Sequence, residues 1–132
     1  MSYRKDLIAY RMSRAKEALQ DAEILLNSKR LPSTVNRIYY ALFYEVTALL
    51  LTKGLSSSKH SGIMALFNEH FVKNGTVSIE TGRFYSRMFE FRQKSDYEDF
   101  VQFEEEKVKE WLVTARQFIE EIGKVIEKII PQ

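Results

Sequence analysis

The stretch from Pro32 to Gly54 constrains the fold more than any other part of the chain. Its sequence, PSTVNRIYYALFYEVTALLLTKG, places apolar residues at the spacing of one wide helical face. The residues on that face are Val35, Ile38, Tyr39, Leu42, Val46, Leu49 and Leu50. Tyr40, Phe43 and Leu51 lie off this stripe, so we expect neighbours on more than one side. The pattern predicts the central helix of a bundle.

Helical periodicity continues on both sides of this central segment. A first helix is expected over about residues 3–27, and a last, long helix over about residues 99–130. Between the central and last helices, a third helix is expected to begin after serines 56–58, one of which would cap it. The turn signal Asn74-Gly75 should end that helix.

A fourth helix is expected to follow Ser78, which is placed to act as its N-cap. Its apolar pattern is lost at residues 93–96, where we expect a bend or a break. No segment alternates with a period of two for long enough to form a sheet. We therefore expect residues 1–132 to form a single all-α domain, an up-and-down bundle of four main helices and one shorter helix.

The composition excludes several kinds of site. The chain has no cysteine, and its two histidines, His60 and His70, occur without a Glu-x-x-His pattern, which argues against a metal centre. There is no glycine-rich phosphate loop. The N-terminal stretch is interrupted by charge every few residues, unlike a signal peptide or a membrane span. We expect a cytoplasmic protein that binds no metal and no cofactor and does not enter a membrane.

Arg92 emerges from an apolar stripe of the fourth expected helix, four residues after Met88 and seven after Tyr85. A guanidinium in such a place requires a partner. One interpretation is a structural ion pair with Asp96, one turn later, if the helix continues that far. Another is that Arg92 and Tyr97 line a cleft for phosphate or a nucleotide, because arginine can donate two parallel hydrogen bonds to phosphate.

A second set of polar residues interrupts the start of the central helix. Asn36 and Arg37 stand there, and Arg37, Tyr40 and Tyr44 share one face because they follow each other by about one turn. They can present a cation and stacking rings to a base or a phosphate, or they can be buried in a dimer interface. His60 is expected in the first turn of the third helix, where it either helps to hold an anion or is a capping or exposed residue.

Three segments carry a resemblance to a known family. They are Tyr39-Tyr40-Ala41 with Phe43, Lys59-His60-Ser61-Gly62 ahead of Phe67, and Arg92-x-x-x-Asp96-Tyr97. In this order they resemble a HEPN domain (higher eukaryotes and prokaryotes nucleotide-binding), in particular the small stand-alone branch often called the uncharacterised 0332 family. The resemblance covers roughly residues 11–127. It implies a helical bundle, usually a homodimer, commonly encoded beside a minimal nucleotidyltransferase and often acting with it as a toxin–antitoxin pair.

The resemblance also implies a reaction. In active relatives, an arginine followed shortly by a histidine forms a metal-independent ribonuclease site that is completed across the dimer. Here the positions that would hold the histidine are occupied by Tyr97, Glu98 and Asp99. The pattern is therefore degenerate, although the family's chemistry is intelligible: histidine moves the proton while arginine stabilises the phosphate charge.

Two hypotheses follow. The first is a homodimeric nucleotide- or RNA-binding regulatory module that associates with a minimal nucleotidyltransferase. The alternative is a metal-independent ribonuclease that uses Arg92 with Tyr97, Glu98 or His60. Arg92 and Tyr97 are the candidate catalytic residues, and the candidate nucleotide-binding residues are Asn36, Arg37, Tyr40, His60 and Asp96.

Overall fold

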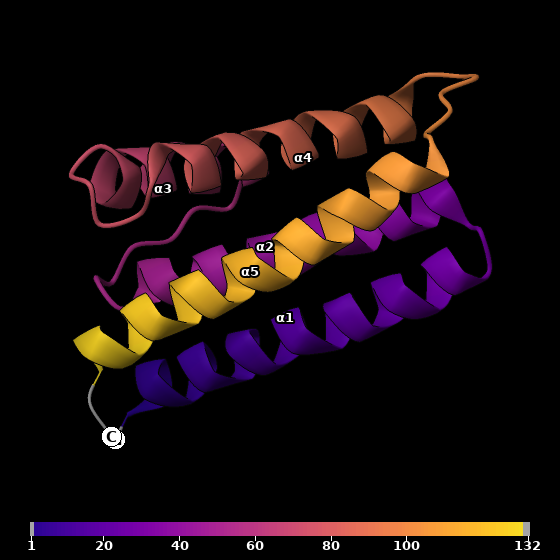
Figure 1. Cartoon of the computed structure of the whole chain (residues 1–132). Helices are drawn as coiled ribbons and strands as arrows, with labels where there is room; N and C mark the ends of the chain where they lie inside the picture. Colours follow the sequence, from indigo (N-terminus) through magenta and orange to yellow (C-terminus); the bar gives the residue numbers. More distant parts are fainter. Residues whose placement is uncertain (1, 131–132) are drawn as a thin grey trace.

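The computed structural model describes residues 2–130. These residues form five α-helices and one π-helical turn, with no β-strand among them. The elements are α1 (Tyr3–Asn27), α2 (Leu31–Leu51), α3 (His60–Phe67), the π turn η1 (Asn68–Val72), α4 (Ile79–Tyr97) and α5 (Glu105–Ile129) (Figure 1). The long helices α1, α2, α4 and α5 alternate in direction, which confirms the expected all-α, up-and-down bundle. None of the helices within residues 2–130 is both long enough and apolar enough to cross a membrane.

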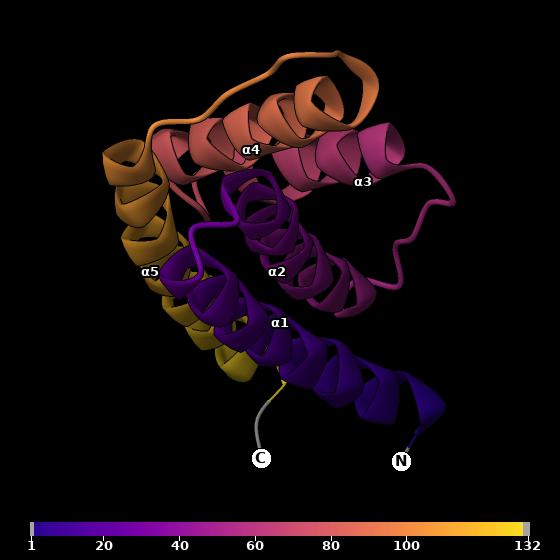
Figure 2. The same cartoon turned by 90° about the vertical axis from the view of Figure 1, so that its right-hand side faces the viewer.

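The helix α2 lies at the centre of this bundle. Figure 2 shows α1, α3, α4 and α5 arranged around it, and each of the four contacts it. Every residue of the apolar face predicted for α2 is completely buried. Because burial of one large aliphatic side chain contributes roughly 1.5–3 kcal/mol, this helix supplies much of the hydrophobic stabilisation.

Local signals set several helix ends as the sequence predicts. The Ser78 hydroxyl caps α4 by accepting a hydrogen bond from the Thr81 amide at 3.1 Å. Pro32 lies in the first turn of α2. Backbone N–H groups in the first turn have no hydrogen-bond partner within the helix, so the helix loses no bond because proline lacks this group. Gly75 has a φ of +81° in the turn before α4, a conformation that glycine adopts without steric strain.

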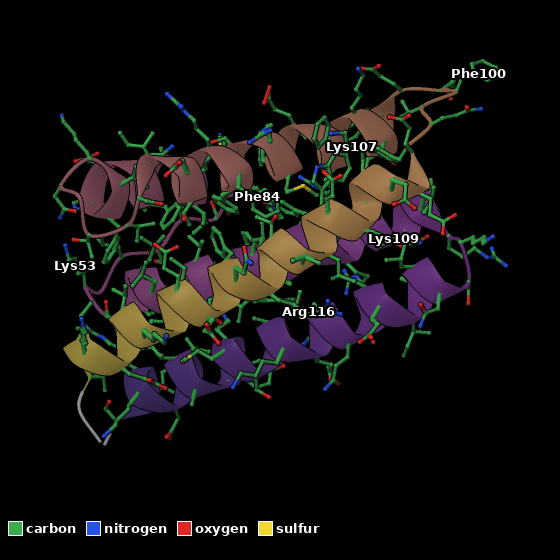
Figure 3. The ribbon with its side chains drawn as sticks, in the orientation of Figure 1. Lys53, Phe84, Phe100, Lys107, Lys109 and Arg116 are labelled. Carbon is green, nitrogen blue, oxygen red and sulfur yellow. The ribbon has the colours of Figure 1, made fainter. Side chains whose placement is uncertain are left out.

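The boundary between α4 and α5 differs from the expectation. The bend expected at residues 93–96 is absent, and α4 continues to Tyr97. The last turn of α4 is largely exposed, so it needs no apolar pattern to continue as a helix. The helix α5 begins at Glu105 instead of near Asp99, because residues 98–104 form a loop in which Phe100 has a left-handed φ of +64°. Phe100 lies at the tip of this loop, away from the helices (Figure 3).

The start of α3 also differs. No serine caps it; the N-cap is Lys59, whose side chain makes no capping hydrogen bond. The Ser57 hydroxyl instead accepts a hydrogen bond from the Lys59 amide at 3.2 Å, which holds the loop just ahead of the helix. This loop places His60 in the first turn of α3, as expected, and directs it toward α2.

Candidate functional site

Arg92 projects from α4 onto the aromatic rings of α2. Its side chain is only 11% exposed, and its guanidinium carbon lies 4.7 Å from the ring centroid of Tyr39 and 5.8 Å from that of Tyr40. Stacking on aromatic rings suits the weakly hydrated guanidinium plane. The Arg92 Nη1 atom lies 3.3 Å from Asp96 Oδ2, so the possible ion pair between these two residues is formed. The buried Arg92 Nε has no hydrogen-bond partner among the described residues.

His60 approaches the same tyrosine from α3. Its Nδ1 atom lies 2.7 Å from the Tyr39 hydroxyl, and its ring stacks on Phe43 with centroids 4.3 Å apart and an interplanar angle of 10°. Tyr39 therefore lies between His60 and Arg92, which are 32 residues apart in the chain. Packing of α2, α3 and α4 brings His60 and Arg92 to one place.

The protonation states at this site follow from burial. Burial raises the pKa of Tyr39 to about 12, so its hydroxyl remains protonated at neutral pH. The pKa of His60 is lowered, first by burial and then by the positive charge of Arg92. The Tyr39 hydroxyl lies 2.7 Å from His60 Nδ1, and the neighbouring Tyr85 hydroxyl lowers the pKa of Tyr39 by less than burial raises it. A buried hydroxyl proton requires an acceptor, so we infer that Tyr39 donates to Nδ1 and that a neutral His60 carries its proton on Nε2.

Asn36, Arg37 and Tyr40 lie together beside this cluster. The Asn36 Oδ1 atom accepts hydrogen bonds from Arg37 Nε at 3.2 Å and from Nη2 at 3.1 Å, while the Arg37 guanidinium lies 5.0 Å from the Tyr40 ring centroid. Asn36 and Arg37 share an open groove of about 580 Å³ with Asp96 and Ser95 of α4. The side chain of Asp96 thus joins the groove to Arg92.

Two of the residues considered from the sequence lie apart from this arrangement. Tyr97 is 81% exposed, whereas Arg92 makes its ion pair with Asp96 and its cation–π contacts with Tyr39, Tyr40 and Phe89. Tyr44 does not share the Arg37 guanidinium with Tyr40. Arg14 of α1 lies over the Tyr44 ring instead, at 5.0 Å, and donates a hydrogen bond to the Tyr44 hydroxyl at 3.3 Å. The Tyr44 ring still lies next to that of Tyr40, with centroids 6.2 Å apart, so the two tyrosines share the expected face of α2 while each stacks with a different arginine.

This arrangement suits an anionic ligand. Arg92 and Arg37 supply guanidinium groups, and His60 supplies an N–H donor from Nε2. Within residues 2–130, no group of three or more His, Cys, Asp or Glu side chains lies close enough together to hold a metal ion. The guanidinium groups of Arg92 and Arg37 are groups that proteins use to bind phosphate.

Comparison with known proteins places the chain in a family. The family model described as HEPN domain matches residues 8–126. This chain belongs to the HEPN domain family. A UPF0332 protein from Thermotoga maritima is 55% identical over 129 residues, which cover 98% of each chain. The family predicted from the three sequence segments is thus confirmed for this HEPN domain.

Other relatives have names that refer to function. A protein of Methanocaldococcus jannaschii named "Putative toxin MJ0605" is 35% identical to this HEPN domain over 116 residues, which cover 88% of this chain and 86% of that protein. A second protein of that organism, named "Putative toxin MJ0142", is 31% identical over 115 residues, covering 87% and 78%. The similarity therefore extends over most of the length of each relative.

Sequence reasoning overlooked two residues of this HEPN site. The sequence places Tyr39 on the apolar face of α2 and Phe43 beside that face, with no site role for either, yet they hold His60 by a hydrogen bond and a ring stack. Their helical spacing indicates only that they face inward. Both residues stand next to Tyr40 in the segment that resembles the family, and this position could have marked them as site residues. It gives no reason, however, to pair them with a residue of another helix.

Proposed function

We propose that this HEPN protein is a homodimeric nucleotide- or RNA-binding regulatory module that pairs with a minimal nucleotidyltransferase, and that Arg92 holds a phosphate group of the ligand. The observation that carries the proposal is the position of Arg92: it is nearly buried, stacked on Tyr39, and paired through a single nitrogen with Asp96. Its Nη2 group is not among the buried atoms without a partner and is available for a phosphate that displaces or joins Asp96.

Two neighbouring features support this assignment. His60 lies on the other side of Tyr39, and its Nε2–H can donate to the same anion. Arg37 and Asn36 line the groove that reaches Asp96, so a second phosphate or a base can lie along α2. The ligand would then contact α2, α3 and α4 together.

The homodimer and the enzyme partner require surfaces beyond this site. Tyr97 and Phe100 stand beside the groove end of α4 and are 81% and 98% exposed. Exposed aromatic side chains are enriched in protein interfaces, which supports a partner at this end of the bundle. Sedimentation at micromolar concentration should give the mass of a dimer; a monomer would count directly against this part of the proposal.

The experiment for ligand binding compares variants of two arginines on α4. Fluorescence anisotropy with labelled ATP and with a short single-stranded RNA should show binding that is lost in Arg92→Ala. Arg87→Ala is the matched control, because Arg87 lies on the same helix, is exposed, and is outside the site. Equal weakening by both substitutions would indicate non-specific attraction to positive charge and would refute the role of Arg92.

The placement of Arg92 and His60 on either side of Tyr39 favours a second candidate function, metal-independent RNA cleavage. His60 would replace the missing motif histidine: it would take the proton of the ribose 2′-hydroxyl, while Arg92 stabilises the charge on the phosphate. This role requires the proton of His60 to move from Nε2 to Nδ1, which leaves the Tyr39 hydroxyl proton without its acceptor. Nucleotide binding without cleavage is therefore the better supported function.

Cleavage can be tested separately. Purified wild type should be incubated with RNA with and without a chelator, alongside Arg92→Ala and His60→Gln. Chelator-resistant cleavage that disappears in both variants, with a 2′,3′-cyclic phosphate on the products, would establish the second candidate. Equal degradation by wild type and variants would identify a contaminating nuclease.

A further inference from the structure

The central helix carries a carboxyl group that the HEPN site does not use. Glu45 is 1% exposed, and its Oε1 atom has no hydrogen-bond partner among the described residues. A buried carboxyl group without a partner is unfavourable, because it loses its hydration and gains no hydrogen bond. Glu45 points to the α1 and α5 side of α2, whereas Tyr39 contacts α3 and α4.

A cavity of about 340 Å³ opens directly over this carboxyl group, between α1 and α5. Its walls include the apolar side chains of Met12 from α1 and Ile119 from α5. Arg116 lies at its rim, on the side of α5 that faces α1 (Figure 3). The cavity shares no lining residue with the groove of Asn36, Arg37 and Asp96.

A glycine in the middle of α5 keeps the cavity open above Glu45. A Cβ atom at position 123 would stand 3.3 Å from Glu45 Oε2 and 3.9 Å from the Met12 Cε atom. Glycine inside a helix is less favourable than alanine by about 0.5–1 kcal/mol. Gly123 thus leaves space next to the carboxyl group, at a cost to the helix.

The charges around the rim narrow the class of ligand. Arg116 pairs with Glu23 at 3.5 Å and Lys124 with Glu120 at 4.0 Å, so two of the basic groups already have acidic partners. Lys16 of α1 and Glu127 of α5 also line the cavity, and both act electrostatically on Glu45. The carboxyl group at the floor has no hydrogen-bond partner for its Oε1 atom among the described residues, and in its ionised form it suits a cationic donor.

We propose that this cavity binds a small aliphatic amine in its ammonium form, with the ammonium group on Glu45 and the alkyl chain against Met12 and Ile119. A second ammonium group, in a diamine, would lie near Glu127 at the rim. This site is independent of the nucleotide-binding proposal, because none of its residues belongs to the Arg92 cluster.

Binding of an ammonium group changes the protonation state of Glu45. Burial raises the pKa of Glu45 to about 8, so at neutral pH the empty cavity holds a protonated, neutral carboxyl group. An entering ammonium group displaces this proton, which is released to the buffer while the carboxylate and the ammonium form an ion pair. Lys16 lowers this pKa and Glu127 raises it, each less than burial does. Binding should therefore release a proton at pH 7 and become tighter as the pH rises toward about 8.

Calorimetric titration of the full chain tests this site. The probes are 1,4-diaminobutane and n-butylamine, in about 0.15 M salt, where the Debye length of about 8 Å screens exposed acidic groups. We expect saturable binding of one molecule per chain, with a heat that differs between buffers of different ionisation enthalpy. Glu45→Gln should weaken binding by about tenfold or more, which corresponds to about 1.4 kcal/mol.

Two further variants separate this site from surface attraction. Gly123→Val should also abolish binding, because its side chain fills the cavity above Glu45. Glu110→Gln, at an exposed position of the same helix, should leave binding unchanged. The proton release needs only the wild-type chain, so it remains a test if a variant fails to fold. No binding of either amine, or equal binding of the amines by wild type and Glu45→Gln, would overturn the proposal.

Discussion

Replacement of Glu45 by glutamine should change how the stability of the protein depends on pH. Burial raises the pKa of Glu45 from an ordinary 4.5 to about 8. Between these values the folded chain holds a proton that the unfolded chain has released. The free energy of unfolding therefore falls as the pH rises from about 4.5 to about 8, and it is independent of this group outside that window.

The magnitude follows from the width of this window. At about 1.36 kcal/mol for each pH unit, the span from 4.5 to about 8 amounts to on the order of 5 kcal/mol. The charged groups that line the cavity over Glu45 are Lys16 from α1 and Arg116, Glu120, Lys124 and Glu127 from α5. Of these, Lys16 lowers the pKa of Glu45 and Glu127 raises it, each less than burial does. Glutamine has nearly the same shape and no charge, so the variant should lose this part of the pH dependence.

The assay is urea unfolding of wild type and Glu45→Gln, followed by circular dichroism at a series of pH values. Other titrating groups affect both proteins, so the informative quantity is the difference between their free energies of unfolding. That difference should shift in favour of the variant by several kcal/mol between about pH 5 and pH 9. Glu110→Gln serves as control: Glu110 is exposed and pairs with Lys107 at 3.7 Å, so its removal should matter by less than about 1 kcal/mol.

Two results would refute this reasoning. In the first, wild type gains stability relative to Glu45→Gln as the pH rises. Glu45 would then be ionised in the folded state and paired with a cation, and Lys16 is the basic residue whose charge acts on Glu45. A difference that does not vary with pH would show that water reaches the carboxyl group freely.

Three further predictions concern the HEPN site and one turn. Tyr39→Phe removes the hydroxyl that donates to His60 Nδ1, so the pKa of His60 should rise, and an NMR titration would measure this change. An unchanged or lower pKa of His60 would show that the Tyr39 hydroxyl is the acceptor. Asp96→Asn removes the carboxylate that competes for Arg92, so labelled ATP should bind a few-fold more tightly in anisotropy titrations, and weaker binding would contradict that competition. Gly75→Ala should lower the free energy of unfolding by about 1 kcal/mol, because φ is +81° at this position, although a Cβ atom there would meet no neighbour. Gly75→Asn should lower the free energy of unfolding by less, because asparagine tolerates this φ better than alanine. Equal losses in the two variants would argue against backbone strain.

The sequence alone determined the helices and the family. The spacing of apolar residues in α2 identified a central helix because side chains three and four residues apart share a helical face wherever the helix lies. Ser78 and Pro32 marked helix starts because capping acts through atoms close in the chain. The same local information failed at residues 93–96, because an exposed last turn of a helix needs no apolar pattern.

Only the tertiary structure decided which side chains meet. The approach of His60 and Arg92 to Tyr39 depends on how α3 and α4 pack on α2, and no spacing within one helix encodes a distance between helices. The burial of Glu45 beneath Gly123 is decided in the same way, since position 45 is polar in the sequence and becomes part of a cavity floor only when α1 and α5 close over it. The periodicity of the sequence decides which residues share a helical face. The packing of the helices against one another decides which groups are buried, and burial in turn decides the pKa values, the cavities and the sites.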